Sequence, residues 1–410
     1  MTFTVSLVTV GDPDTMTGGY LYHRRVADRA ATNDARIDFR SLPTSRFPLP
    51  LLAGRSLMAR IRREQPDVVL LDSIAAAFVG PWLGAGARAA GSGAAGPGAA
   101  GPGAAGPGAA GPRAFGAGAG AAGGPGAGAR GAGAAGARAG ALPPVVAILH
   151  QPPGGIDHGG LRRSLQARLD RTAYRHVSRL LVASADLADT LRAGGLPGDL
   201  MRVVPPGRDP ASSAVIDPGD LRAGRRAAVL SVGNWVARKG LLDLLEALAS
   251  LPADAATLHL LGDDAVEPAY ASRVRERMAA PDLAGRVVAH GVKTPGEVVG
   301  FYRAADVFAL ASLREPYGTV YGEAMTEGLP VVGWDAGNLP HLARNGVEGL
   351  AVPPGDVPAL AEALRSLTLD EPVRRRMAAA AKLRASEFPT WDDTARMVFD
   401  ELRDVVKEAQ

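Results

Sequence analysis

AAVLSVGNWVARKGLLDLLEALASL, residues 227–251, combines an apolar strand, a loop that contains two glycines and an amphipathic helix. The run 227–232 is apolar except for one serine, which is typical of a strand buried on both faces of a sheet. From Leu241 the apolar residues recur at spacings of three and four, the period of a helix that buries one face. The segment therefore predicts one βα unit, the building block of a parallel sheet covered by helices.

The same alternation of strand and helix continues in both directions along the chain. Towards the C-terminus it predicts strands at 257–261, 287–289, 307–310, 331–332 and 350–352, with helices at 268–278, 295–303, 320–327 and from 357 to near 408. Towards the N-terminus it predicts strands at 3–10, 36–39, 67–71, 145–149, 180–183 and 202–204, with helices at 18–31, 51–63, 162–176 and 185–193. Two successive series predict an α/β fold of two Rossmann-like domains that face each other across a cleft.

Composition sets the domain boundaries. Pro205-Pro206-Gly207 separates the two series, so we expect a first domain at 1–207 and a second at 208–388. Between residues 84 and 140, 51 of 57 residues are Gly, Ala or Pro. A stretch with so little to bury is expected to be a disordered insert of the first domain.

Composition also excludes several classes of protein. The chain has no cysteine, which excludes disulfides and cysteine nucleophiles and agrees with a reducing cytoplasm. The formal net charge is only +3, which gives no sign of a nucleic-acid partner. The N-terminus lacks the basic segment of a signal peptide, and no apolar run is long enough for a transmembrane helix. We therefore expect a cytoplasmic protein.

Two carboxylates in the second domain carry the strongest chemical signal. In EPYGTVYGEAMTEGLP, residues 315–330, Glu315 follows a predicted strand and Glu323 lies about one turn into the next helix. A helix N-terminus offers free N–H groups and a positive dipole end to a phosphate. Carboxylates accept hydrogen bonds from sugar and ribose hydroxyls. The pattern favours a nucleotide-sugar site, although Glu323 alone also fits a favourable charge in a first helical turn.

A second signal lies in the loop after 227–232. Lys239 follows Asn234 and Arg238 there, and it is one of four lysines in a chain with 41 arginines. Lysine binds phosphate as a point charge, although a solvated basic pair is the alternative.

Two weaker signals lie in the first domain. Gly18 and Gly19 open the first helix and permit close approach to a phosphate or a sugar, although paired glycines are also common in turns. His150 ends the strand 145–149, where a residue facing the cleft is expected, although a structural histidine fits equally well.

Together these segments resemble the retaining glycosyltransferases of family GT4, or group 1, which have the GT-B fold. The interval from Glu315 to Glu323 is similar to the EX7E motif of that family, and Lys239-Gly240 is similar to its Lys-Gly pair. Gly18-Gly19 and His150 resemble its glycine-rich loop and its histidine in the first domain. The likeness covers the chain outside 84–140.

The resemblance implies a role for each matching residue. His150, Lys239 and Glu315 would be catalytic, with His150 near the transferred sugar, Lys239 near the diphosphate and Glu315 on the sugar hydroxyls. The implied donor site consists of Gly18, Gly19, Asn234, Arg238, Lys239, Val292, Glu315, Tyr317, Gly318, Thr319, Val320 and Glu323. Glu323 would hold the ribose. The helix at 389–410 would cross back onto the first domain.

The implied activity is transfer of a sugar from a nucleoside-diphosphate sugar to an acceptor hydroxyl with retention, without a metal or another cofactor. Asp12-Pro13-Asp14 matches a DxD motif, which binds a divalent metal ion in another glycosyltransferase fold. A turn after the first strand is the favoured interpretation here. The chain departs from the family at Asn234, where arginine is usual, and at Asn338 and His341, where glycine and glutamate are usual. Two alternatives are therefore open: a nucleotide-sugar-binding protein without transfer activity, and a sugar-nucleotide epimerase of the same fold.

Residues 160–179 raise the question of a membrane partner. This segment holds six arginines and one acid, with Leu161, Leu165 and Leu169 four residues apart. It fits a basic helix that lies on the inner face of an anionic membrane. It also fits a surface helix whose leucines pack into the core, and this second interpretation is favoured.

Overall fold

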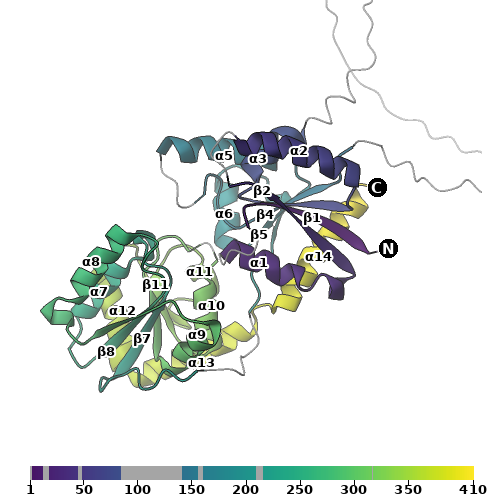
Figure 1. Cartoon of the computed structure of the whole chain (residues 1–410). Helices are drawn as coiled ribbons and strands as arrows, with labels where there is room; N and C mark the ends of the chain where they lie inside the picture. Colours follow the sequence, from purple (N-terminus) through teal and green to yellow (C-terminus); the bar gives the residue numbers. More distant parts are fainter. Residues whose placement is uncertain are drawn as a thin grey trace, which may run out of the picture.

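The computed structural model describes residues 2–12, 18–44, 49–84, 141–155, 160–208, 216–315 and 317–410. The disordered insert expected at 84–140 therefore lies, apart from Gly84, outside the described residues, as do Pro13 and Asp14. In the described part of the chain the strands form two sheets of six strands each, and neighbouring strands are parallel throughout. Each sheet belongs to a separate domain (Figure 1).

The strands of the first sheet are β1 (Phe3–Val10), β2 (Ala35–Leu42), β3 (Val68–Asp72), β4 (Val145–Leu149), β5 (Arg179–Val182) and β6 (Met201–Val203). Its helices are α1 (Gly18–Ala27), α2 (Leu49–Glu64), α3 (Ala76–Leu83), α5 (Gly160–Tyr174) and α6 (Ala185–Ala193). The spatial order is β2-β1-β3-β4-β5-β6. The chain therefore reverses its direction of travel across the sheet between β1 and β3, and a ligand is expected beside the carboxyl ends of these strands.

The strands of the second sheet are β7 (Ala227–Val232), β8 (Ala256–Leu261), β9 (Val287–Gly291), β10 (Val307–Leu310), β11 (Val331–Trp334) and β12 (Gly349–Val352). Its helices are α7 (Leu241–Ala249), α8 (Pro268–Met278), α9 (Pro295–Ala304), α10 (Thr319–Thr326), α11 (Leu339–Leu342), α12 (Val357–Leu369) and α13 (Glu371–Ser386). The spatial order is β12-β11-β10-β7-β8-β9. The reversal point lies between β7 and β10, so the loops after these two strands form the expected site.

Both faces of the first sheet are covered, because its strands alternate apolar side chains from one face to the other. Along β3, Val69 and Leu71 pack with residues of α2, α3, α5 and α6, whereas Val68 and Leu70 pack with residues of α1 and of the C-terminal helix. This two-sided burial is what the uninterrupted apolar runs predicted. No helix in the described ranges is both long and apolar enough to cross a lipid bilayer.

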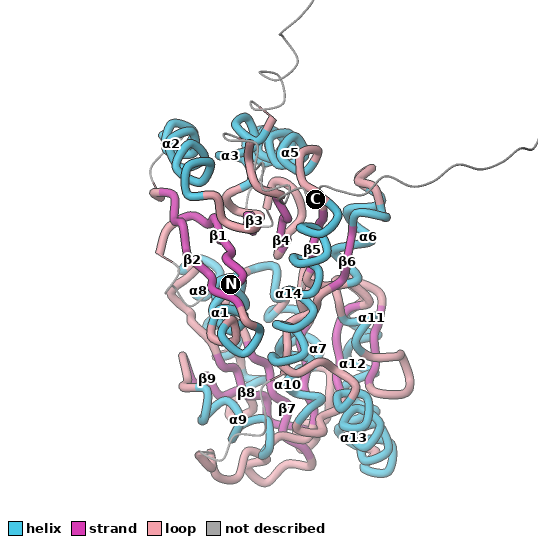
Figure 2. The backbone as a smooth tube through the Cα atoms, turned by 90° about the vertical axis from the view of Figure 1, so that its right-hand side faces the viewer, coloured by secondary structure: helices cyan, strands magenta, loops and turns pink. Residues whose placement is uncertain are grey.

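The last helix, α14 (Trp391–Glu408), crosses from the second domain to the first (Figure 1). It begins at a capping box in which Thr390 and Asp393 bond to each other's backbone N–H group. Val398, Phe399 and Leu402 are fully buried in the core of the first domain. Figure 2 shows α14 lying across the first sheet. The α/β fold of two Rossmann-like domains with a returning C-terminal helix is thus confirmed.

Candidate functional site

The two loops at the reversal point of the second sheet lie against each other. In the first, the 3-10 turn Ala237–Lys239 ends at Gly240, which has φ = +64°. A Cβ atom at Gly240 would lie 2.0 Å from the carbonyl oxygen of Ala311 in the second loop, so only glycine fits this close approach. Leu313 donates its N–H to the carbonyl of Arg238 (3.0 Å), which fixes one loop on the other.

These loops bring Lys239 and Glu315 together. Both side chains are buried, at 7% and 8% exposure, and the Lys239 ammonium donates a hydrogen bond to Oε2 of Glu315. The guanidinium of Arg238 reaches the same loop and donates to the carbonyl of Arg314 (3.2 Å). A buried charge stays buried only with a partner, so each of the two ions holds the other in place.

Asn338 supports the loop that follows Glu315. Its side-chain amide donates to the carbonyl of Tyr317 (2.8 Å), and its backbone N–H donates to the carbonyl of Glu315 (3.0 Å). The sequence marked Asn338 only as a departure from the family pattern. The structure gives it a role, because Asn338 directly precedes α11 and its hydrogen bonds hold the loop that leads into α10.

Helix α10 begins directly after this loop. Thr319 and Val320 are its first two residues, and their N–H groups precede the first helical hydrogen bonds, which Tyr321 and Gly322 make to the carbonyl of Gly318. N–H groups in this position point at any anion that lies before the helix. One turn later, Glu323 accepts a hydrogen bond from the buried hydroxyl of Tyr302 on α9 (3.0 Å).

On the opposite side, the first domain contributes a buried cluster at the carboxyl ends of its strands. His150 follows β4, Asp72 ends β3, and His23 lies on α1 four residues after Gly19. Nε2 of His23 lies 3.1 Å from Oδ2 of Asp72 and 3.3 Å from Nε2 of His150. Thr9 donates a second hydrogen bond to the same Asp72 oxygen (2.9 Å). His23 and Asp72 were not predicted as site residues.

The cluster shifts the protonation of its members. Burial alone would raise the pKa of Asp72, but His23, His150 and the Thr9 hydroxyl outweigh burial and lower this pKa to about 2. Burial, together with the nearby His23, lowers the pKa of His150 to about 3 against the opposing effect of Asp72. At neutral pH the carboxyl group is therefore an anion and the His150 imidazole is neutral.

The same three residues are of the types that bind metals. The Nε2 atoms of both histidines and a carboxylate oxygen of Asp72 lie within 4.8 Å of one another. Hydrogen bonds also join these side chains to one another and to Thr9.

The two domains meet at this cluster. The ring of Tyr317, from the second domain, lies 5.5 Å from the ring of His150, centre to centre. Nε2 of His341 on α11 lies 3.6 Å from a carboxylate oxygen of Asp189 on α6. Figure 2 shows the two sheets on either side of this junction. Glu315 thus faces the first domain across the cleft that the sequence predicts.

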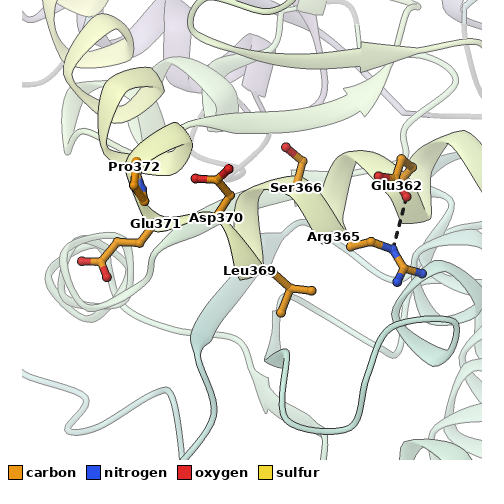
Figure 3. Close-up of a pocket in the computed structure, with 7 residues that line it drawn as sticks. All are labelled: Glu362, Arg365, Ser366, Leu369, Asp370, Glu371 and Pro372. Atoms are coloured by element: carbon orange, nitrogen blue, oxygen red, sulfur yellow. Dashed lines mark ion pairs between the residues drawn. The ribbon is translucent and has the colours of Figure 1, made fainter.

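Two cavities lie at this junction between the domains. One, of about 240 Å³, is bounded by Glu315 and Arg314 on one side and by Arg163, Asp186 and Thr190 on the other. The second, of about 290 Å³, lies beside the interdomain crossing and includes residues of α10, Thr319 and Glu323 among them. A third hollow, over the junction of α12 and α13, contains none of the predicted site residues (Figure 3).

The structure therefore brings together most of the residues proposed from the sequence. Gly19 packs on His150, since a Cβ atom at this glycine would lie 3.3 Å from the imidazole ring. Gly18 is the first residue of α1. Two residues lie further out: Asn234 is exposed and accepts a hydrogen bond from the N–H of Asp263, and Val292 is 73% exposed just after the edge strand β9. Their assignment to the donor site stays a prediction.

Comparison with known families identifies the two domains. The model of glycosyl transferases group 1 matches residues 217–384, and the model of the glycosyl transferase 4-like domain matches residues 122–207. Together the two models match more than half of the chain. The chain belongs to the group 1 glycosyl transferases. Residues Lys239, Glu315 and Glu323 all lie within the part that matches the group 1 glycosyl transferase model.

Individual relatives agree with this group 1 assignment. The chain is 33% identical over 240 residues to the D-inositol 3-phosphate glycosyltransferase of Xylanimonas cellulosilytica, covering 54% of this chain and 56% of that protein. It thus spans little more than half the length of the curated relatives it matches.

Solved structures share the fold. Anabaena Alr3699/HepE, solved with UDP and glucose, has a TM-score of 0.69 at 19% identity, covering 97% of this chain and 99% of that one. Sucrose-phosphate synthase from Thermosynechococcus elongatus has a TM-score of 0.70 at 18% identity, covering 99% of both chains. At this level of identity the likeness shows the fold alone.

Proposed function

We propose that this protein transfers a sugar from a nucleoside-diphosphate sugar to an acceptor hydroxyl, with retention of the anomeric configuration and without a metal ion. The observation that carries the proposal is the buried Lys239–Glu315 pair, beside the N-terminus of α10 and on a cavity that residues of the first domain also line. Structures of Alr3699/HepE hold UDP with glucose, and UDP-glucose. These structures make a uridine-diphosphate sugar the first candidate donor for this chain.

In this proposal the donor replaces one ion pair by several contacts. The diphosphate takes the Lys239 ammonium and the N–H groups of Thr319 and Val320, and Glu315 turns its released oxygens to hydroxyls of the sugar. Glu323 accepts a hydrogen bond from the ribose through its carboxylate. The ammonium and the helix N-terminus provide positive charge where the leaving phosphate becomes more negative.

The transfer step then needs no nucleophile from the protein. The bond from the anomeric carbon to the diphosphate oxygen breaks while the acceptor oxygen bonds to the same carbon on the same face. The acceptor proton passes to the departing diphosphate. A route through a covalent sugar–enzyme intermediate would need a carboxylate beside the anomeric carbon. Glu315, which pairs with Lys239 in the free protein, bonds to sugar hydroxyls in this proposal and does not act as the nucleophile.

The acceptor side of the cleft is polar. Arg163, Asp186 and Thr190 of the first domain face Glu315 around the cavity of about 240 Å³. We propose that this cavity takes the acceptor hydroxyl, carried by a small molecule, a glycan or a lipid headgroup. No cofactor beyond the donor is required in this proposal.

We also propose that the protein works in the cytoplasm, in contact with the inner face of an anionic membrane through α5. The favoured interpretation of α5, that its leucines pack into the core, is wrong for two of them. Leu161 is 87% exposed and Leu165 is 50% exposed, on a helix that also carries exposed arginines. Apolar side chains beside basic ones suit an anionic lipid surface.

The test is calorimetric titration of the whole chain with UDP-, GDP-, ADP- and dTDP-glucose in the presence of EDTA. We expect one donor to bind, with the affinity reduced about tenfold or more in Lys239→Met because a phosphate loses its charged partner. The matched control is Lys382→Met, which removes an exposed lysine on α13 and is expected to leave binding unchanged.

Product analysis completes the test. Slow release of free sugar, and a product with the donor's anomeric configuration by proton NMR, support the transferase. Tight binding without release would favour the binding-protein alternative, and release of an altered sugar the epimerase. Activity that EDTA abolishes and Mg²⁺ restores would overturn the metal-free mechanism.

A further inference from the structure

The imidazole of His150 has one nitrogen whose role the interactions above do not explain. Its Nε2 faces His23, but its Nδ1 is buried and has no hydrogen-bond partner among the described residues. A buried polar atom without a partner costs free energy, so such an atom points to a ligand that completes it. Whether Nδ1 would donate or accept depends on the tautomer, and the neighbours of the ring determine that tautomer.

Asp72 decides which ring nitrogen of His23 carries a hydrogen. Its Oδ2 accepts from the Thr9 hydroxyl and lies 3.1 Å from Nε2 of His23. An ionised carboxylate only accepts hydrogen bonds, and the low pKa of Asp72 keeps it ionised. Nε2 of His23 must therefore carry a hydrogen. This holds whether the His23 ring is neutral or charged.

The hydrogen on Nε2 of His23 in turn decides the tautomer of His150. The two Nε2 atoms are 3.3 Å apart, and the one on His23 already carries a hydrogen. A hydrogen on Nε2 of His150 as well would set two N–H dipoles against each other. His150 is neutral and has one ring hydrogen, so that hydrogen lies on Nδ1. The unpartnered nitrogen is thus a donor.

We propose that His23 and Asp72 are positioning residues that hold His150 in its Nδ1–H tautomer, so that Nδ1 donates a hydrogen bond to a hydroxyl of the transferred sugar. That a sugar hydroxyl accepts this hydrogen bond rests on the proposed function, whereas the tautomer of His150 does not. The surroundings suit this role: Gly19 packs on the imidazole ring, and Tyr317 brings the donor loop of the second domain against it.

The first experiment observes the tautomer without any donor. Long-range proton–nitrogen NMR of the ¹⁵N-histidine-labelled whole chain distinguishes a protonated ring nitrogen from an unprotonated one, and His150→Gln assigns the signal. We expect hydrogen on Nδ1 in the wild type and a shift towards Nε2–H in His23→Leu. His23→Gln keeps two N–H donors near the position of Nε2, so it is expected to retain the wild-type tautomer.

The second experiment separates the sugar from the nucleotide. In His23→Leu we expect the rate of donor hydrolysis at saturation to fall about tenfold, because a hydrogen bond to the sugar is lost, while the Kd for UDP alone stays unchanged. His23→Gln is expected to recover most of the rate. A merely structural role of His23 would instead change the affinity for UDP and the melting temperature together with the rate.

Three results would overturn the proposal. Hydrogen on Nε2 of His150 in the wild type removes its basis, and so does a tautomer that His23→Leu leaves unchanged. Stoichiometric zinc in the purified chain would show that the three side chains bind a metal instead. Failure of the proposed function gives a different result: the Nδ1–H tautomer is present, yet no nucleotide sugar binds, and then only the sugar contact is lost.

Discussion

The carboxylate of Glu315 faces an ammonium 76 positions away in the sequence, and the carboxylate of Asp72 faces an imidazole from α1. Neither pair is visible as a local motif, because each forms only when two loops at one sheet edge come together. The consequence is that a change at one residue acts through its partner. Asn338 offers a clear case, since its side chain reaches the donor loop through one hydrogen bond from its amide.

Asn338→Ala is expected to raise the Kd for the donor about fivefold, because the loss of one hydrogen bond to Tyr317 loosens the loop before α10. The matched control is Asn345→Ala, which removes a hydrogen bond to the N–H of Ala351 outside the site. Titration calorimetry with the donor found for the wild type measures both. Equal effects of the two variants would remove Asn338 from the site.

A second prediction at this scale concerns Asp170 of α5. Burial raises the pKa of this carboxyl to about 7 from 3.8, against the opposing hydrogen bond from the N–H of Gly154. The folded state therefore keeps the proton up to about pH 7, whereas the unfolded state releases it near pH 4. Between these values the wild type loses stability as the pH rises, by up to about 1.4 kcal/mol per pH unit.

Asp170→Asn removes this titration and keeps an oxygen that accepts from Gly154. We expect its free energy of unfolding, minus that of the wild type, to increase steadily from pH 4 to pH 7. Urea titrations at four pH values measure this difference. A difference that does not vary with pH would mean that the carboxyl group ionises normally in the folded state.

The site residues of the second domain are easier to predict from the sequence than those of the first. Glu315, Glu323 and Lys239 are polar residues in an apolar βα pattern and stand out. Asp72 could have been found, because it ends a buried apolar strand at an expected ligand edge. His23 could not have been predicted from the sequence, because its role depends on the direction of α1. His23 lies one helical turn after Gly19, and the direction of this helix places it against His150.

At the scale of elements, strands were predicted well because burial on both faces produces short apolar runs with clear ends. β1, β4, β7 and β10 have the predicted bounds. Helix α3 was missed, because Ala76–Leu83 is apolar on every side and contains Pro81, so it has no amphipathic period. Helix α11 was missed because four residues are too few to show a period.

Helix α5 carries the prediction at this scale. Leu161→Ser is expected to reduce the fraction of protein that sediments with anionic vesicles, with a partition coefficient about tenfold lower, because the exposed leucine loses its apolar contact with the lipid. The matched control is Leu383→Ser, at a residue that is 70% exposed on α13. Binding should weaken as salt is added, since the arginines of α5 contribute through their charge. A wild type that stays in the supernatant at low salt would contradict the membrane proposal.

For the whole molecule, two chain segments join the domains and run side by side. The N–H of Arg208 donates to the carbonyl of Pro389 (2.8 Å), and the hydroxyl of Thr394 donates to the carbonyl of Pro205 (2.9 Å). Gly207 has no room for a side chain, because a Cβ atom there would lie 2.4 Å from the backbone nitrogen of Trp391. The crossing therefore couples the end of the chain to its first domain at a point that borders the cleft.

The returning helix predicts how the molecule unfolds. Each domain has its own core, so calorimetry should resolve two transitions. Phe399 is near the C-terminus, yet it packs in the core of the first domain. Phe399→Ala should therefore lower the midpoint temperature of the first domain's transition, by an amount that corresponds to a loss of about 3–5 kcal/mol in the free energy of unfolding. Leu367→Ala, equally buried in the second domain, should lower the other. Bound UDP-glucose assigns the transitions, because it raises that of the second domain more. If both variants lowered the same transition, α14 would unfold together with the second domain. That result would contradict its coupling to the first domain through the crossing.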